Sequence, residues 1–308
     1  MDVARRSVDE AVAPVSRRLL PVVVVRDAGA SLLVASRRDA PLVTLALEFN
    51  GGHADDPRDR PGLADLAASL CNEGGGGMTP LEWHRRLDND AISMDIQPTA
   101  VRWVARLNCL VEDLDEATDL FTRWLEAPTL PAGEWKRLVK TYRAGARELW
   151  AQPISAIDAL SSVQVFGFGH PMAHPAYERS YAESRYEEAC DVARRAPCRQ
   201  SDIIAMVGGD IDQDAGLDLL RRLLDRLPAG TATRWIEPEP AGAPHDVWIL
   251  DNREIDQVYF ALGRVGSRAG DPQRMALRLA DYALGSGGFS SRLMKRVRSE
   301  MGHTYSIG

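Results

Sequence analysis

The sequence predicts an α+β protein made of two similar α/β-layer halves, each an antiparallel-rich sheet packed with helices, with the second half incomplete in this chain. Two observations lead to this fold class. The expected strands and helices do not follow the regular βαβ order of a parallel sheet. In addition, the end of the chain repeats its beginning with an offset of 215 residues.

The repeat is visible residue by residue and in the order of the elements. The matching residues are Ala261-Leu262 with Ala46-Leu47, Gly266 with Gly51, and Asp271-Pro272 with Asp56-Pro57. Each copy reads as strand, strand, glycine turn, Asp-Pro, helix and glycine loop. A single repeat over this distance indicates two similarly folded halves rather than a solenoid. We therefore expect an N-terminal arm at 1–18, a first half at 19–227, a proline-containing linker at 228–245, and the first strands and helix of a second half at 246–308.

Local patterns give the elements of the first half. Alternating and β-branched runs predict strands at 21–25, 31–35, 42–49 and 203–207, and a hairpin of strands 91–97 and 101–107 around Pro98 and Thr99. Apolar residues at positions 63, 66, 67 and 70 predict a helix over 62–71. Further helices are expected at 81–88, 114–125, 134–150, 155–165, 186–194 and 214–227.

Composition narrows the possible functions. The chain of 308 residues is 45% hydrophobic and 26% charged, which is ordinary for a globular protein, and its formal net charge is -7. This charge provides no basic field for nucleic acid or for anionic lipid. No segment is long and apolar enough to span a bilayer, and the N-terminus resembles neither a secretory signal nor a transit peptide. We therefore expect neither nucleic-acid nor membrane partners.

The cysteines favour a reducing compartment, and hence a cytoplasmic protein. Cys71, Cys109, Cys190 and Cys198 are scattered and show no C-x-x-C spacing. This pattern suits reduced core thiols better than a disulfide framework or a thiolate metal site.

The last stretch, residues 284–308, carries the most specific pattern. A glycine loop that contains Gly285, Gly287 and Gly288 leads to Phe289 and Ser290. A short helix follows, for which Ser290 and Ser291 are good N-cap residues and Gly302 is a suitable stop. Residues 304–307 read as the start of a strand. Arg298 and Tyr305 therefore lie at the two ends of a tight connection between helix and strand.

This combination resembles the pitrilysin/insulinase family of inverzincin metallopeptidases, which includes the mitochondrial processing peptidase and its bacterial relatives. The resemblance covers residues 32–308. It rests on the glycine loop with the Arg298/Tyr305 pair, on Phe168-Gly-His-Pro171, on Met206-Val-Gly-Gly-Asp210, and on the internal repeat.

The zinc motif of the family is missing from this sequence. Catalytic members carry H-x-x-E-H on the first long helix, with two zinc ligands one turn apart and a glutamate general base. In register, the motif falls on Asp65, Ala68 and Ser69 in place of His, Glu and His. The third ligand is expected near 144–146, where only Glu148 lies close by. We therefore predict that this chain holds no catalytic zinc.

The resemblance implies a role shared with a second chain. In the family, the Arg/Tyr pair faces the zinc and resembles an oxyanion device for a scissile carbonyl. Some bacterial members divide the zinc motif and the Arg/Tyr pair between two chains. The leading hypothesis is thus a zinc-free, substrate-binding subunit that is inactive alone. Beside an H-x-x-E-H-bearing partner subunit that carries the zinc, it would supply Arg298 and Tyr305 for the cleavage of short or unfolded peptides. The alternative is a non-catalytic scaffold.

Plainer interpretations stand beside these assignments. Arg298 and Tyr305 can be a surface arginine and a packed tyrosine, and the glycine loop can be a simple turn. Asp65 and Ser69 share a helix face and can merely line a cleft.

Pro171 and Pro175 prevent a metal-binding helix at His170 and His174, so both imidazoles are expected to face solvent. His53 is expected to be a packing or surface residue. The strand at 91–97 is either a sheet edge that accepts a peptide or an ordinary hairpin strand.

Overall fold

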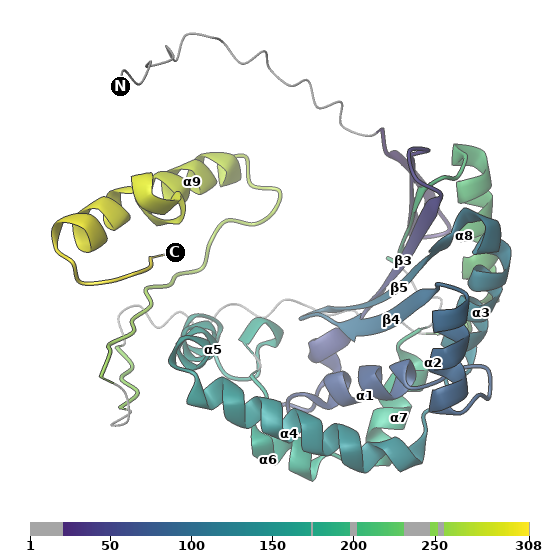
Figure 1. Ribbon diagram of the computed structural model, residues 1–308, viewed down its shortest axis with the longest axis horizontal. Coiled ribbons are helices and arrows are strands. Elements are labelled where there is room, and N and C mark those ends of the chain that lie inside the picture. The colour runs from purple at the N-terminus through teal and green to yellow at the C-terminus, as the bar shows by residue number, and fades with distance from the viewer. Residues whose placement is uncertain (1–20, 174, 198–201, 231–246, 252–255, 308) are drawn as a thin grey trace, which may run out of the picture. The chain divides into compact units, whose positions relative to one another are not determined.

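The computed structural model of the protein describes residues 21–173, 175–197, 202–230, 247–251 and 256–307. The chain divides into two compact units, of which the first ends at Ala261 and the second begins at Leu262. The first unit contains a sheet with helices, whereas the described part of the second is helical (Figure 1). The predicted arm at 1–18 and positions 231–245 of the predicted linker lie outside the described residues.

A six-stranded sheet organises the first unit, with the strand order β1-β2-β6-β3-β5-β4. The strands are β1 (Val23–Asp27), β2 (Ala30–Ser36), β3 (Leu42–Asn50), β4 (Ser93–Pro98), β5 (Arg102–Leu110) and β6 (Ile204–Gly209). Only β2 and β6 pair in parallel; the other neighbours in this sheet are antiparallel. The β4–β5 turn is closed by Thr99 N–H, which donates to the Arg102 carbonyl at 2.6 Å. The α+β class, the antiparallel-rich sheet and the hairpin are thus confirmed.

Helices account for most of the remaining described chain. In the first unit they are α1 (Leu63–Asn72), α2 (Pro80–Asn89), α3 (Leu114–Glu126), α4 (Trp135–Ala151), α5 (Pro153–Phe166), α6 (Glu178–Glu183), α7 (Tyr186–Arg195) and α8 (Gln213–Arg226). The sequence pattern predicts all of them except α6, which is too short to show an apolar stripe. Helix α8 packs on β2 and β6, α3 packs on β5, and α1 lies along β4 (Figure 1).

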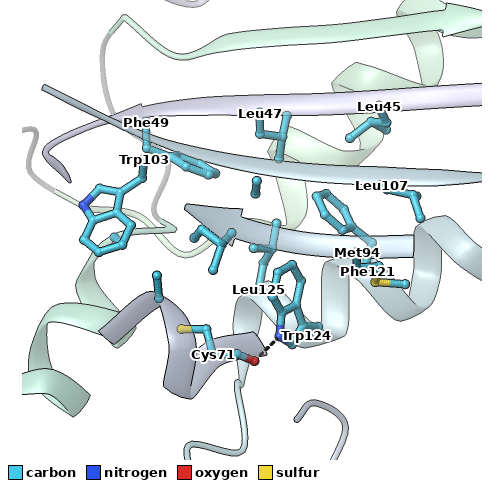
Figure 2. Packing of buried hydrophobic residues seen from close by; sticks show 14 of the residues in the cluster. Leu45, Leu47, Phe49, Cys71, Met94, Trp103, Leu107, Phe121, Trp124 and Leu125 are labelled. Carbon is cyan, nitrogen blue, oxygen red and sulfur yellow. Dashed lines mark hydrogen bonds between the residues drawn. The ribbon is translucent and has the colours of Figure 1, made fainter. Parts of the chain in front are cut away.

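The core fills the space between the sheet and these helices. Leu45, Leu47 and Phe49 alternate along β3 and point to one face, as the two-residue period of a strand requires. They pack with Phe121 and Trp124 of α3 in one continuous buried cluster (Figure 2). Trp124 Nε1 also donates to the carbonyl oxygen of Cys71, at the end of α1, at 2.8 Å. The first helix is therefore anchored to the core at its C-terminal turn.

The second unit begins with an irregular stretch and then forms α9 (Arg274–Asp281). A π-helical turn follows at Tyr282–Ser286, and a second one covers Met294–Glu300. The helix predicted in the repeat is therefore present. The strands predicted near 261–262 and at 304–307 are wrong, because the described residues from 256 to 307 form no strand. A strand is stable only where a neighbouring backbone completes its hydrogen bonds, and the described residues of this unit provide no such neighbour.

Candidate functional site

Helix α1 carries the positions onto which the sequence comparison predicted the zinc motif to fall, and the start of this helix is held by a loop carboxylate. Asp56 is buried, and its two oxygens accept hydrogen bonds from Gly62 N–H at 2.8 Å and Ala64 N–H at 2.7 Å. These backbone donors at a helix N-terminus stabilise a negative charge. Gly62 adopts φ +96°, and a Cβ on it would lie 2.4 Å from the Tyr181 ring. Glycine is therefore required where Tyr181 meets the helix.

The two polar motif positions are each bonded to a tyrosine. Asp65 Oδ2 accepts a hydrogen bond from the Tyr181 hydroxyl at 3.0 Å. One turn later, Ser69 Oγ and the Tyr142 hydroxyl lie 2.8 Å apart. The two tyrosine rings pack at a tilt with their centroids 5.2 Å apart. Ala68, at the general-base position, is only 4% exposed and belongs to the core. The motif positions are thus built into a hydrogen-bonded contact between α1, α4 and α6.

His53 adds a titratable group to this network. Its Nε2 lies 3.7 Å from Asp65 Oδ1, and its Nδ1 lies 3.5 Å from Asp56 Oδ2. Burial acts to lower the pKa of His53, but the two carboxylates outweigh it, so the pKa lies above its ordinary value. Burial raises the pKa of Asp65, against the opposing effects of His53 and Tyr181. The Asp56 and Asp65 carboxylates therefore favour the protonated form of His53.

A pocket of about 390 Å³ opens beside this network. It is lined by Asp65, Thr141, Tyr142, Gly145, Ala146, Leu149, Ala176 and Tyr181. The structure therefore places Asp65 opposite the segment 144–146 where the third ligand was expected. Glu148, which follows that segment in the sequence, is exposed and does not line the pocket.

The residues present do not fit a zinc ion. Zinc in proteins is bound by cysteine, histidine and carboxylate ligands, usually four in structural sites and three plus water in catalytic sites. Here Asp65 is held by Tyr181, and Ser69 is held by Tyr142. No group of three or more His, Cys, Asp or Glu side chains suitable for a metal occurs among the described residues. No chemistry in this chain is therefore assigned to a metal.

The glycine loop of the second unit has a shape that side chains would disrupt. A Cβ on Gly287 would lie 2.5 Å from the Tyr282 carbonyl oxygen, to which Gly287 N–H donates at 2.8 Å. Gly288 adopts φ +66°, which favours glycine. Ser290 Oγ donates to the Gly287 carbonyl at 3.2 Å. A Cβ on the buried Gly285 would contact Leu293 at 3.6 Å and Ile307 at 3.8 Å.

Arg298 and Tyr305 follow this loop on a short helical segment and the tail behind it. The Arg298 guanidinium lies over the ring of Phe289, 4.4 Å from its centroid, in a cation–π contact. Gly302, with φ +68°, ends the helical segment as predicted, and its N–H donates to the Arg298 carbonyl at 3.1 Å. The Tyr305 side chain is 83% exposed. The structure thus joins Arg298 to the loop through Phe289 and leaves Tyr305 at the surface of the unit as described.

Other predicted features have mixed outcomes. The strand predicted at 91–97 is an edge strand, because β4 ends the sheet. The prediction that His170 faces solvent is wrong: it is 3% exposed, stacks on Phe166, and accepts a hydrogen bond from Met172 N–H at 3.1 Å. A short 3₁₀ turn over Pro171–Ala173 folds the chain over the imidazole. His174 lies outside the described residues.

Sequence reasoning did not assign a role to the tyrosines of the network. Tyr142 and Tyr181 come from α4 and α6, far from α1 in sequence, and no local spacing connects them. His53 was expected to be an isolated packing or surface residue. The one local signal is Asp56-Pro57 ahead of α1, because a carboxylate before a helix often caps it.

Comparisons with known proteins identify the fold as that of the M16 peptidases. A family profile described as "Peptidase M16 inactive domain" matches residues 198–308. The crystal structure of a peptidase M16 inactive domain from Pseudomonas fluorescens superposes with a TM-score of 0.78 at 24% identity, over 93% of this chain and 70% of that one. A protease from Helicobacter pylori superposes with a TM-score of 0.66 at 12% identity, over 92% and 69%.

A curated relative adds a sequence match. The "Non-peptidase homolog YmxG" of Helicobacter pylori is 25% identical over 271 residues. The match covers 87% of this chain, which spans 61% of the length of that relative. The resemblance to the pitrilysin/insulinase peptidases is confirmed, because residues 198–308 match the M16 inactive domain and the chain shares the fold of these proteins. Because proteins described as a protease and as a non-peptidase both resemble this chain, the fold alone does not determine activity.

Proposed function

We propose that this chain is the zinc-free, substrate-binding subunit of a two-chain metallopeptidase that cleaves short or unfolded peptides. The proposal rests on the contacts of the side chains at the predicted zinc-motif positions of α1. Asp65 and Ser69 are bonded to Tyr181 and Tyr142, and Ala68 is buried. A peptidase that uses this chain must therefore obtain its metal and its general base from a partner, which we take to be an H-x-x-E-H-bearing homologous subunit.

In this proposal the second unit provides the chain's contribution to catalysis. Arg298 and Tyr305 would donate hydrogen bonds to the oxygen of the scissile carbonyl as negative charge develops on it. Gly285, Gly287, Gly288, Phe289 and Ser290 would form a substrate-facing loop. The contact of Arg298 with the 69% exposed Phe289 supports a shared surface for the loop and the arginine. An exposed tyrosine hydroxyl is likewise available to a substrate.

Reconstitution with the zinc-bearing homologue from the same organism tests this function. The isolated chain should cleave no unfolded protein, and the mixture should show cleavage that a chelator abolishes. Tyr305→Phe should then lower kcat by about 10²–10³ with little change in KM, as expected for the loss of one oxyanion donor. Tyr259→Phe, which removes a hydroxyl from another surface tyrosine, is the matched control. Chelator-sensitive cleavage by the isolated chain would refute the proposal.

A scaffold role is the second candidate, and the relative described as a non-peptidase homolog favours it. A scaffold binds its partner but contributes no donor to the reaction. Arg298→Ala and Tyr305→Phe would then leave a reconstituted complex fully active. The same kinetic experiment therefore separates the two candidates.

The thiols give no support to an independent cysteine-based activity. Cys71, Cys109 and Cys190 are buried free cysteines. Burial raises the pKa of Cys71 to about 12 and that of Cys109 to about 11, which disfavours the nucleophilic thiolate. Buried free thiols suit a reducing compartment, so we propose a cytoplasmic location. Among the described residues, no helix has the length and apolar character needed to cross a bilayer.

A further inference from the structure

The pocket of about 390 Å³ beside α1 is not used by the proposed peptidase function, and its lining suits one kind of small ligand. Asp65 is the one charged side chain among the described residues that line it. Leu149, Ala146 and Ala176 form an aliphatic part of the wall. Pockets of a few hundred Å³ with an apolar wall and few polar groups are typical of small-molecule sites. This pocket therefore fits a compact ligand with an apolar body and one polar end.

The polar end of the pocket favours a positive charge on the ligand. Asp65 and Asp56 share His53, whose Nε2 lies 3.7 Å from Asp65 Oδ1 and whose Nδ1 lies 3.5 Å from Asp56 Oδ2. Even a protonated His53 offsets only one of these two carboxylates, so the three side chains together keep a negative charge. The Asp65 side chain is 24% exposed, and a carboxylate accepts several hydrogen bonds. A donor from a cationic ligand can therefore reach it.

Two aromatic side chains line the pocket beside this carboxylate. The Tyr181 hydroxyl donates to Asp65 Oδ2 at 3.0 Å, and the rings of Tyr142 and Tyr181 pack with their centroids 5.2 Å apart. Aromatic rings attract ammonium groups through the negative potential of their faces. Tyrosine rings next to a carboxylate thus form a combination that recognises an organic ammonium ion.

Gly145 keeps the pocket open at a position where packing does not require glycine. It lies inside α4, and glycine is among the least favourable residues in a helix interior. Among the described residues, no atom outside the backbone of this helix would lie within 4 Å of a Cβ at position 145. Close packing therefore does not explain this glycine, whereas access to the pocket does.

We propose that this pocket binds a small organic amine, whose ammonium group pairs with Asp65 and whose apolar body lies against Leu149, Ala146 and Ala176. The site uses neither Arg298 nor Tyr305 and needs no partner subunit. It therefore adds a ligand-binding function to the chain that is separate from the proposed role in peptide cleavage.

The test measures the affinity of the full chain for three indole compounds that differ mainly in the charge of their polar end. These are tryptamine, which is a cation, tryptophol, which is neutral, and indole-3-propionate, which is an anion. In isothermal titration calorimetry, tryptamine should bind with a Kd of about 1 mM or lower. Tryptophol should bind about tenfold more weakly, because it lacks the charge-assisted hydrogen bond, and indole-3-propionate should not bind.

A lysine side chain of a polypeptide could present the same ammonium group, so Nα-acetyl-lysine amide forms a separate arm of the titration. Its thin alkyl chain contacts less of the apolar wall, and it should bind more weakly than tryptamine. Tighter binding of the lysine derivative would overturn the assignment to a small amine.

A filled pocket provides the sharpest variant. Gly145→Leu places a side chain in the open space without altering the Asp65 network, and should abolish tryptamine binding. The variant should unfold at no lower temperature than the wild type, because leucine is a better helix former than glycine. Gly133→Leu makes the same change at an exposed glycine with equally open surroundings, and should bind tryptamine like the wild type.

A charge variant tests the role of the carboxylate. Asp65→Asn keeps an acceptor for the Tyr181 hydroxyl but removes the charge, and should weaken tryptamine binding by about tenfold. Should Asp65→Asn fail to fold, Gly145→Leu and the three indole compounds decide the matter.

Three results would each overturn the inference: no binding of tryptamine to the wild type, equal affinities for tryptamine and tryptophol, or undiminished binding in Gly145→Leu. These measurements use the chain without a partner. Their failure is therefore distinct from failure of the proposed function, which is scored by cleavage in the reconstituted pair.

Discussion

The zinc-motif face of α1 and the segment that carries Arg298 and Tyr305 differ in how far the chain itself uses their side chains. Asp65 and Ser69 each bond to a tyrosine of another helix, and Ala68 lies in the core. Tyr305, in contrast, is largely exposed in its unit. Polar side chains that are satisfied inside a fold contribute to its stability, whereas exposed ones remain available to a ligand. The α1 face is thus built into the fold, whereas Tyr305 is exposed in its unit, as the proposed role in substrate binding requires.

The largest expected effect comes from restoring the family's general base. Ala68→Glu places a carboxylate at a position that is only 4% exposed, and an uncompensated buried charge costs about 3–5 kcal/mol. Ala283→Glu places the same change on an exposed helical residue of the second unit, where surface substitutions stay within about 0.5 kcal/mol. Urea unfolding measures both. Similar stabilities of the two variants would show that position 68 tolerates charge and that the α1 face is not structural.

A smaller loss is expected from breaking one hydrogen bond of the network. Tyr181→Phe removes the donor to Asp65 and leaves a mostly buried carboxylate without that partner, which costs about 1–3 kcal/mol. Loss of this donor should also raise the pKa of Asp65 further, because the hydrogen bond favours the charged form. Tyr282→Phe, at an exposed tyrosine of the second unit, is the matched control. Equal midpoints for both variants in thermal unfolding would contradict the difference between the two regions.

The sequence predicted most of this fold because its elements have strong local patterns. The apolar spacing along α1 and the alternation along β3 each determine which face packs on the core, so these elements could be placed from the sequence. The strands of the second unit were predicted wrongly, since the repeat carries strand-like residues but not the partners that make them strands. The Tyr142 and Tyr181 contacts depend on tertiary packing, for which a single sequence shows no spacing rule.

The smallest expected effect is a pH dependence of the free energy of unfolding, caused by His53 beside the α1 face. The folded-state pKa of His53 lies above its ordinary value of about 6.5 because Asp56 and Asp65 outweigh the effect of burial. Protonated His53 therefore stabilises the fold fully below about pH 6.5, and this contribution is lost as the pH rises through the folded-state pKa. The raised pKa of Asp65 acts in the same direction, because ionisation of this buried carboxyl costs stability as the pH rises.

The stability difference between the wild type and His53→Gln should accordingly favour the wild type most near pH 6 and shrink toward pH 8, as measured by urea unfolding at each pH. In an Asp65→Asn background the same substitution should show a flatter profile, because one of the two carboxylates that hold the imidazolium is gone. A difference that grows with pH would mean that burial dominates at His53, and that the network holds a neutral imidazole. The face of α1 would then be closer to ordinary core packing than to a charged replacement for the metal site.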